Sequence, residues 1–391
     1  MRKKDLSIVF ASFLMAGSIL TGCNNEEKTS SSENKQEQTE KKENTAKEEK
    51  VDYAVSFKEA VTELEKAKEG KEVDFDKVTE IYTKDLQELT QKRDTEFEDK
   101  IDQHITNALQ AGKDGSMNPV VVKQIFDKLM QKVFYTSIKH DFKEIEEMWS
   151  DKEVVKEELE EAKGYYAILQ STVEKRDAAN GTKLVDAIAG GFSEIEKAIE
   201  ADDLLGFQLG KQVVDKTMIK TFYLATGNNP NGYAYKAAEA AKSDKDEAIV
   251  EQAEGWAFYQ SIYSYLNGHA PEQAALILEQ FDLQNDVSKL DAEKVNKAFV
   301  SGYAKVALDE YAESQELWGE DKSVITALEG ALFIDTIDKD LIKLLGEEGF
   351  NKLHETASKY LEAAKAKDKA TGETLMKELQ STLQTVIEKA K

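Results

Sequence analysis

From Val51 onward, apolar residues recur every three or four positions, which is the spacing of amphipathic α-helices. No segment shows the convincing apolar and polar alternation that a half-buried strand requires. Only three prolines occur in 391 residues, and so few helix breakers favour long helices. We therefore predict an all-α fold. Its expected helices are 54–68, 76–111, 119–149, 151–178, 182–201, 203–226, 245–266, 271–283, 292–317, 322–346, 348–366 and 370–390.

The chain repeats itself. Residues 123–135 (KQIFDKLMQKVFY) and 211–223 (KQVVDKTMIKTFY) are identical at eight of thirteen positions. Upstream of them, Lys92-Arg93-Asp94 matches Lys175-Arg176-Asp177 in the same order. Two ordered matches indicate a duplicated unit of roughly 85 residues.

Weaker matches extend the repeat. Residues 250–256 resemble 159–165, which aligns Gly255 with Gly164, and a fourth copy is suggested by 328–331. The interpretation is tandem three-helix units at about 74–149, 150–232, 243–319 and 320–391. We group them into helical regions 51–232 and 233–391. The units could stack as a solenoid or pair as bundles.

The N-terminal residues carry an export pattern. Three basic residues at positions 2–4 precede an apolar run from Leu6 to Ile19, which is too short for a comfortable membrane span. The run ends in Leu20-Thr21-Gly22-Cys23, which resembles a bacterial lipobox. The resemblance implies that 1–22 is a signal peptide and that Cys23, the only cysteine, becomes the lipidated first residue. The alternative is an ordinary signal peptide with a chance cysteine.

Residues 24–50 contain no large apolar side chain, so this stretch cannot bury enough surface to fold. We expect 23–50 to be the lipidated cysteine and a disordered tether, with a span on the order of 30 Å. Two acyl chains suffice for stable anchoring. The lipobox and the helical body together resemble uncharacterised lipoproteins of Gram-positive bacteria, which implies a location on the outer face of the cell membrane.

The net charge, the single cysteine and the absence of catalytic motifs argue against several classes of function. The 76 acidic and 52 basic residues give a formal charge of −24, which argues against nucleic-acid binding and against docking flat on an anionic membrane. A single cysteine excludes an internal disulfide framework. No nucleophile elbow, P-loop or HExxH motif occurs. We expect a non-catalytic binding or accessory protein, anchored by lipid, with an envelope protein or transporter as a possible partner. An envelope enzyme is the less favoured class.

The repeated helix supplies the first candidate ligand-binding residues. Lys132, Lys220 and Lys305 recur beside the apolar stripe of each copy. They could face Asp94, Asp177 or a bound anion, or they could belong to a solvated face or an inter-helix ion pair. Asp94 and Asp177 could equally serve as caps or in salt bridges near helix ends. The richest aromatic cluster surrounds Trp256, which is a candidate apolar site or simply core.

Metal binding is the second candidate. His140, Glu144 and Glu147 share one face of an expected helix, but helix ligands need partners from a second helix. The alternative for these three residues is an exposed polar face. The corresponding function is metal or haem capture for an uptake system. No cofactor other than the lipid on Cys23 is expected from the motifs.

Overall fold

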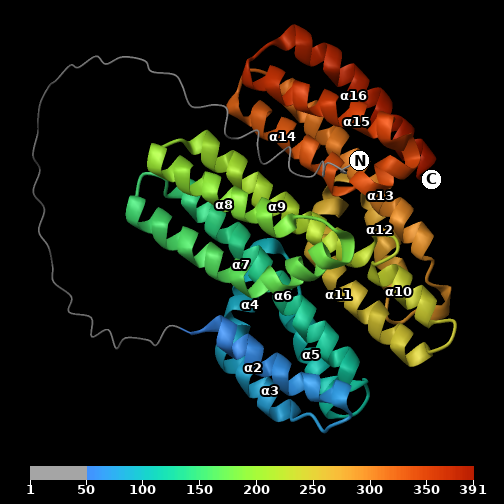
Figure 1. Ribbon diagram of the computed structural model, residues 1–391. Coiled ribbons are helices and arrows are strands. Elements are labelled where there is room, and N and C mark those ends of the chain that lie inside the picture. The colour runs from blue at the N-terminus through green and yellow to red at the C-terminus, as the bar shows by residue number, and fades with distance from the viewer. Residues whose placement is uncertain (1–50) are drawn as a thin grey trace, which may run out of the picture.

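The computed structural model describes residues 51–391, which are helical almost throughout and include no β-strand (Figure 1). The all-α prediction is therefore confirmed for this part of the chain. The expected signal peptide 1–22, the lipobox with Cys23 and the tether to residue 50 lie outside the described residues. In the described part, no helix is both long enough and apolar enough to cross a bilayer.

The first unit follows an N-terminal helix and begins with a helix that changes type along its length. A π-helical turn joins its two α-helical parts, and two further helices complete the unit. The elements are α2 (Tyr53–Glu65) with η3 (Lys66–Glu69), then α3 (Phe75–Ile81), η4 (Tyr82–Leu86), α4 (Gln87–Phe97), α5 (Ile101–Lys113) and α6 (Pro119–Glu147).

The expected single helix at 76–111 is wrong, because the chain turns between α4 and α5. Glu98 adopts a left-handed conformation (φ 55°) and ends α4. The carboxylate of Asp94 then accepts hydrogen bonds from the backbone N–H groups of Ile101 and Asp102, both at 2.8 Å. These bonds satisfy two N–H groups that lack partners at the start of α5. A side-chain cap therefore stabilises a helix boundary that periodicity alone did not mark.

The remaining three units each contribute three main helices, and a short extra helix, α10, links the second unit to the third. Helix α10 was not among the helices expected from the sequence. The elements are α7 (Lys152–Asn180), α8 (Leu184–Ala201), α9 (Leu204–Thr226), α10 (Tyr233–Ala240), α11 (Lys245–His269), α12 (Pro271–Phe281), η5 (Val287–Lys289), α13 (Ala292–Glu316), α14 (Asp321–Thr336), α15 (Asp338–Lys365) and α16 (Lys369–Lys389).

The last unit divides its first two helices differently from the prediction. The expected helix 322–346 is interrupted at Ile337, between α14 and α15. Gly346, with φ 76°, breaks the helical conformation inside α15. The second of these breaks matches the expected boundary between 346 and 348. The interruption at Ile337 lies where Lys220 of α9 contacts Asp335 and Asp338.

The third helices of the first two units, α6 and α9, occupy the middle of the molecule (Figure 1). Every residue from 121 to 138 in α6 is buried, and so is every residue from 212 to 226 in α9. Helix α6 packs against α7 and α11, while α9 packs against α8, α11 and α14. Each of these two units therefore touches the next unit and also the one after it. The four units form one repeat-like helical body with a continuous core.

Candidate functional site

The central helices bury charged side chains that repeat between units. Lys128 Nζ lies 2.8 Å from Asp127 and 3.3 Å from Glu254 of α11. In the next copy, Lys216 Nζ lies 2.7 Å from Asp215 and 3.2 Å from Glu329 of α14. The same lysine, aspartate and glutamate arrangement thus joins α6 to α11 and α9 to α14.

The opposite charges of the buried lysines and aspartates stabilise each other in the charged form. Burial alone would raise the pKa of Asp127, but the charges of Lys128 and Lys123 outweigh it and hold the pKa below its usual range. The Tyr135 hydroxyl donates a 2.6 Å hydrogen bond to the equivalent aspartate, Asp215. Because every lysine here has a carboxylate partner, the network stabilises the packing of the units. It does not present a free charge to a ligand.

The three lysines predicted as ligand contacts have protein partners. Lys132 pairs with Asp99 at 2.7 Å. Lys220 pairs with Asp335 at 2.9 Å and Asp338 at 3.1 Å, and it also donates to the backbone carbonyl of Asp335. Lys305 donates to the amide oxygen of Gln273 at 2.9 Å. Lys220 forms an inter-helix ion pair and Lys132 pairs with an aspartate in the turn between α4 and α5, so the solvated-face interpretation is wrong for both.

The two repeated aspartates do not face those lysines through direct ion pairs. Asp177 accepts hydrogen bonds from the N–H groups of Leu184 and Val185, as Asp94 does at the start of α5. Their shared role is to cap the helix that follows, and each cap holds a turn between two helices. The capping interpretation is the one that the geometry supports.

The region around Trp256 brings several predicted residues together. Its half-buried ring contacts the ring of His104 edge to face, with centroids 5.1 Å apart. Burial lowers the pKa of His104, and the nearby charges of Asp94 and Lys132 act on it in opposite directions. Trp256, Asp94 and Lys132 thus lie around His104, where α5, α6 and α11 meet.

The predicted metal ligands do not converge. His140 Nδ1 lies 2.9 Å from Glu96 of α4, whereas Glu147 is within 3.7 Å of Lys143. Within residues 51–391, no group of three or more His, Cys, Asp or Glu side chains is arranged to hold a metal ion, a finding that covers Glu144 as well. Metal or haem capture remains a prediction from the sequence.

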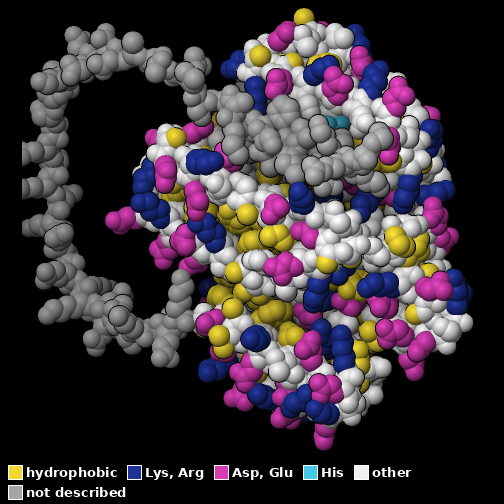
Figure 2. Space-filling model, viewed as in Figure 1, with side chains coloured by type: hydrophobic (Ala, Val, Ile, Leu, Met, Phe, Trp, Pro, Cys, Tyr) yellow, Lys and Arg dark blue, Asp and Glu magenta, His cyan; other side chains and the backbone are white. Residues whose placement is uncertain are grey.

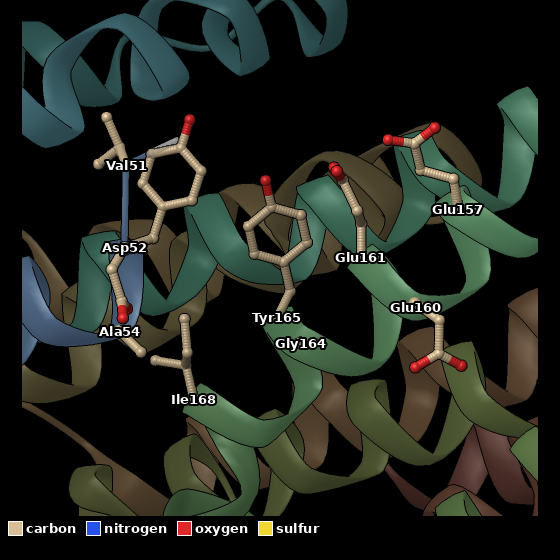
Figure 3. Close-up of a pocket in the computed structure, with 10 residues that line it drawn as sticks. Val51, Asp52, Ala54, Glu157, Glu160, Glu161, Gly164, Tyr165 and Ile168 are labelled. Carbon is tan, nitrogen blue, oxygen red and sulfur yellow. The ribbon is translucent and has the colours of Figure 1, made fainter. Parts of the chain in front are cut away.

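A cleft of about 500 Å³ lies between the N-terminal end of α2 and the exposed side of α7 (Figure 3). Its lining contains acidic and apolar residues and no lysine, arginine or histidine. The lining residues are Val51, Asp52, Tyr53, Ala54, Glu157, Glu160, Glu161, Gly164, Tyr165 and Ile168. Figure 3 shows Tyr165 and Glu161 projecting from α7 on one side, with Glu160 pointing the other way.

Aromatic rings form one wall of this cleft. The rings of Tyr53 and Tyr165 stack with centroids 6.1 Å apart, and Tyr165 stacks in turn on the buried Phe134 at 6.0 Å. Stacking on a core ring of α6 gives the tyrosines a fixed orientation. Val51 and Val55 beside them are 37% and 59% exposed. Figure 2 shows hydrophobic side chains gathered on this face, near where α2 and α7 meet.

The cleft depends on a glycine. A Cβ atom at Gly164 would meet nothing within 4 Å, so the absence of a side chain leaves open space on α7. At the equivalent repeat position, Gly255 is covered by Phe281. Helix α7 could therefore carry a side chain here without a clash. The space above Gly164 is part of the cleft because no other element covers it.

A buried carboxyl group, that of Asp141, interacts electrostatically with Glu161 and Tyr165 of the cleft lining. Asp141 of α6 is only 2% exposed, and its Oδ2 atom has no hydrogen-bond partner. Burial, which is the largest cause, and the charges of Glu158 and Glu161 together raise the pKa of Asp141 to about 8. A neutral, protonated Asp141 is therefore the favoured state at pH 7.

Replacing Asp141 with asparagine should make the stability of the protein less sensitive to alkaline pH. A carboxyl group with a raised pKa contributes its full stability below its unfolded pKa, and that stability is lost as pH rises through about 8. Between pH 5 and pH 9, we expect Asp141→Asn to lose about 4 kcal/mol less unfolding free energy than the natural protein. Urea denaturation at both pH values measures this difference.

The exposed Glu157, changed to glutamine, is the control for that comparison, and its pH dependence should follow the natural protein. An unchanged pH dependence in Asp141→Asn would show that Asp141 ionises normally in the folded state.

Sequence reasoning did not find the cleft. Tyr165 was not among the predicted site residues, and Gly164 was noted only as a position of the repeat. The available signal was the local run of acidic residues at 157–161 beside a glycine and two tyrosines. That signal becomes a site only when α2 packs across it. Comparison of the chain with protein-family models, with curated proteins and with solved structures finds no match.

Proposed function

We propose that this protein binds, without catalysis, a small organic cation that also has an apolar part. The observation that carries the proposal is the composition of the α2 and α7 cleft, where carboxylates and tyrosine rings occur together and basic side chains do not. A volume of about 500 Å³ falls in the range of small-molecule sites. The cleft is the acidic and aromatic surface that a cationic ligand requires.

Two physical effects would act on such a ligand. The acidic lining adds to the field of a chain with formal charge −24, and this field raises the local concentration of cations. The face of a tyrosine ring attracts a cation by about 0.5–2 kcal/mol, depending on how dry the contact is. Valine and isoleucine side chains at the edge of the cleft would cover the apolar part of the ligand.

We test this function with n-hexylamine, which is cationic at pH 7 and has a short apolar chain. The protein should bind n-hexylamine more than tenfold more tightly than the neutral 1-hexanol or the anionic hexanoate, measured by ligand-observed NMR. Equal affinity for the three compounds would show that the charge of the ligand does not contribute to binding. No binding of n-hexylamine would refute the proposed function.

The location of binding is tested by filling the cleft. Gly164→Leu places a side chain in the open space on α7, and we expect it to weaken n-hexylamine binding at least tenfold. Gly268→Leu is the matched control, because Gly268 is also an exposed helical glycine with nothing within 4 Å of its Cβ position. If both variants bind as the natural protein does, the ligand binds elsewhere.

We also propose that a lipid on Cys23 holds this binding body at the outer face of the membrane. The support is the lipobox-like run at positions 20–23 and the position of the only cysteine. Cys23→Ser should move the protein from the membrane fraction to the soluble fraction of exporting cells. Retention in the membrane fraction would contradict the lipid anchor. A transporter as recipient of the ligand stays a prediction.

A further inference from the structure

Asp141 has a buried carboxyl group with an unsatisfied oxygen atom. It is 2% exposed, no residue donates a hydrogen bond to its Oδ2 atom, and no lysine or arginine pairs with it within 4.0 Å in residues 51–391. A carboxylate in this state costs several times more than a neutral polar group to bury. The other buried aspartates of α6 and α9 are paired with lysines, so Asp141 is an exception to the pattern of this protein.

The surroundings of Asp141 connect it to the cleft. Glu161 and Tyr165 line the cleft, and both interact electrostatically with Asp141. The positive charge of Arg93, whose guanidinium lies 3.3 Å from Glu96, favours ionisation of Asp141. The titratable and charged groups around Asp141 are Glu158, Glu161 and Tyr165 from α7, Arg93 and Glu96 from α4, Tyr53 from α2, and His140 and Glu144 from α6 itself.

We propose that the ligand of the cleft is a primary amine, whose ammonium group passes between Glu161 and Tyr165 and donates hydrogen bonds to Asp141. This inference rests on the proposed function and narrows its ligand class. The apolar chain of the amine lies along Tyr53 and Ile168, and the ammonium group lies at the inner end of the cleft. The ligand thereby supplies the positive charge that lysines supply elsewhere on the central helices.

The chemistry of the head group selects a primary amine over a quaternary one. An ammonium group carries three N–H donors, whereas a trimethylammonium group carries none and is much larger. A buried carboxylate is stabilised strongly by each charged hydrogen bond and gains little from a cation without donors. Tyrosine rings alone would accept either head group. A preference for the primary ammonium group over the trimethylammonium group therefore indicates hydrogen bonding to Asp141.

Binding of the ammonium group moves a proton. At pH 7 most of the Asp141 population is protonated, because burial raises the pKa of this carboxyl group to about 8. The positive charge of the ligand favours the carboxylate, so the proton of Asp141 leaves to the solvent as the ammonium group binds. No covalent bond forms or breaks in the ligand. Up to about one proton is released per amine bound at pH 7.

The test compares n-hexylamine with N,N,N-trimethylhexylammonium, which carries the same chain. In the natural protein, we expect the primary amine to bind at least tenfold more tightly. Calorimetry in two buffers of different ionisation enthalpy should show proton release for the primary amine only. In Asp141→Asn, the preference and the proton release should both disappear, with far-ultraviolet circular dichroism confirming that the variant is folded.

Each outcome separates the inference from the proposed function. Equal binding of the two compounds in the natural protein overturns the inference and leaves cation binding intact. A preference that survives in Asp141→Asn but is lost in Glu161→Gln overturns the role of Asp141 and assigns the ammonium group to Glu161. If neither compound binds, the proposed function and the inference both fall. Proton release is measured on the natural protein, so that part of the test does not depend on a variant that folds.

Discussion

Lys220→Ala is expected to lower the free energy of unfolding by about 3–5 kcal/mol, the range for removing one partner of a buried ion pair. The lysine side chain is 4% exposed and donates to two carboxylates and one backbone carbonyl. Without it, the partly buried carboxylates of Asp335 and Asp338 would lie close together with no lysine between them. Urea denaturation monitored by circular dichroism measures the change.

The contact also explains a helix boundary. Lys220 of α9 binds at the junction where α14 ends and α15 begins, and a cation is favoured at the C-terminal end of a helix. The lysine therefore stabilises the interruption at Ile337 that divides the expected helix 322–346. We expect the junction to loosen in Lys220→Ala, which hydrogen exchange of residues 333–341 would detect as faster exchange.

Lys305→Ala is the control from the same repeat position. Lys305 is only half-buried and donates to a neutral glutamine, so its loss leaves no charge unpaired. We expect a cost of about 1 kcal/mol. If Lys220→Ala costs no more than Lys305→Ala, then water reaches Asp335 and Asp338, and the ion pair does not stabilise the α9 and α14 contact.

Leucine at two equivalent glycines should have opposite effects. A Cβ atom at Gly255 would lie 2.3 Å from the buried ring of Phe281, so Gly255→Leu forces that ring or helix α12 to move. We expect a loss of about 3 kcal/mol of unfolding free energy from this overpacking. At Gly164 the same substitution meets open space and replaces a residue that weakens helices, so we expect a gain of about 0.5–1 kcal/mol.

Thermal and urea unfolding of the two variants would measure the contrast. The comparison is matched, because both positions lie in the first helix of a unit and in the same register of the repeat. Equal destabilisation of both variants would mean that α2 and the cleft wall cover Gly164 as fully as Phe281 covers Gly255. A stable Gly164→Leu protein is also the condition for its use as the blocked form in the binding experiment.

The repeat was predictable because sequence identity survives where the packing demands are strict. Lys123, Asp127 and Lys128 match Lys211, Asp215 and Lys216, and Asp127 and Asp215 each pair with the lysine that follows. The capping aspartates were visible for the same reason. The sequence did not reveal which carboxylates on other helices pair with the buried lysines, because an ion pair between helices depends on which units pack together.

Of the two alternatives for the repeated lysines, the solvated face is wrong for a physical reason. An amphipathic pattern assumes that one face of a helix meets solvent. Helices α6 and α9 are surrounded on all sides, so their polar faces contact other helices. Besides the adjacent aspartate on its own helix, Lys128 has a carboxylate partner on α11 and Lys216 has one on α14, in each case two units further along the chain. Periodicity describes one helix at a time and does not contain that information.

The sequence by itself determined the helical class, most helix boundaries and the repeated unit, because these depend on spacing, caps and glycines within a few residues of one another. It also carries the lipobox-like run on which the proposed anchor rests. Only the tertiary structure decided which charges are buried and where a ligand could bind. The cleft forms because Tyr53 of α2 meets Tyr165 of α7 beside an uncovered glycine, and the buried Asp141, whose Oδ2 has no hydrogen-bond partner, interacts electrostatically with its lining. Such contacts join residues of separate helices, and their geometry is set by the packing of the whole core.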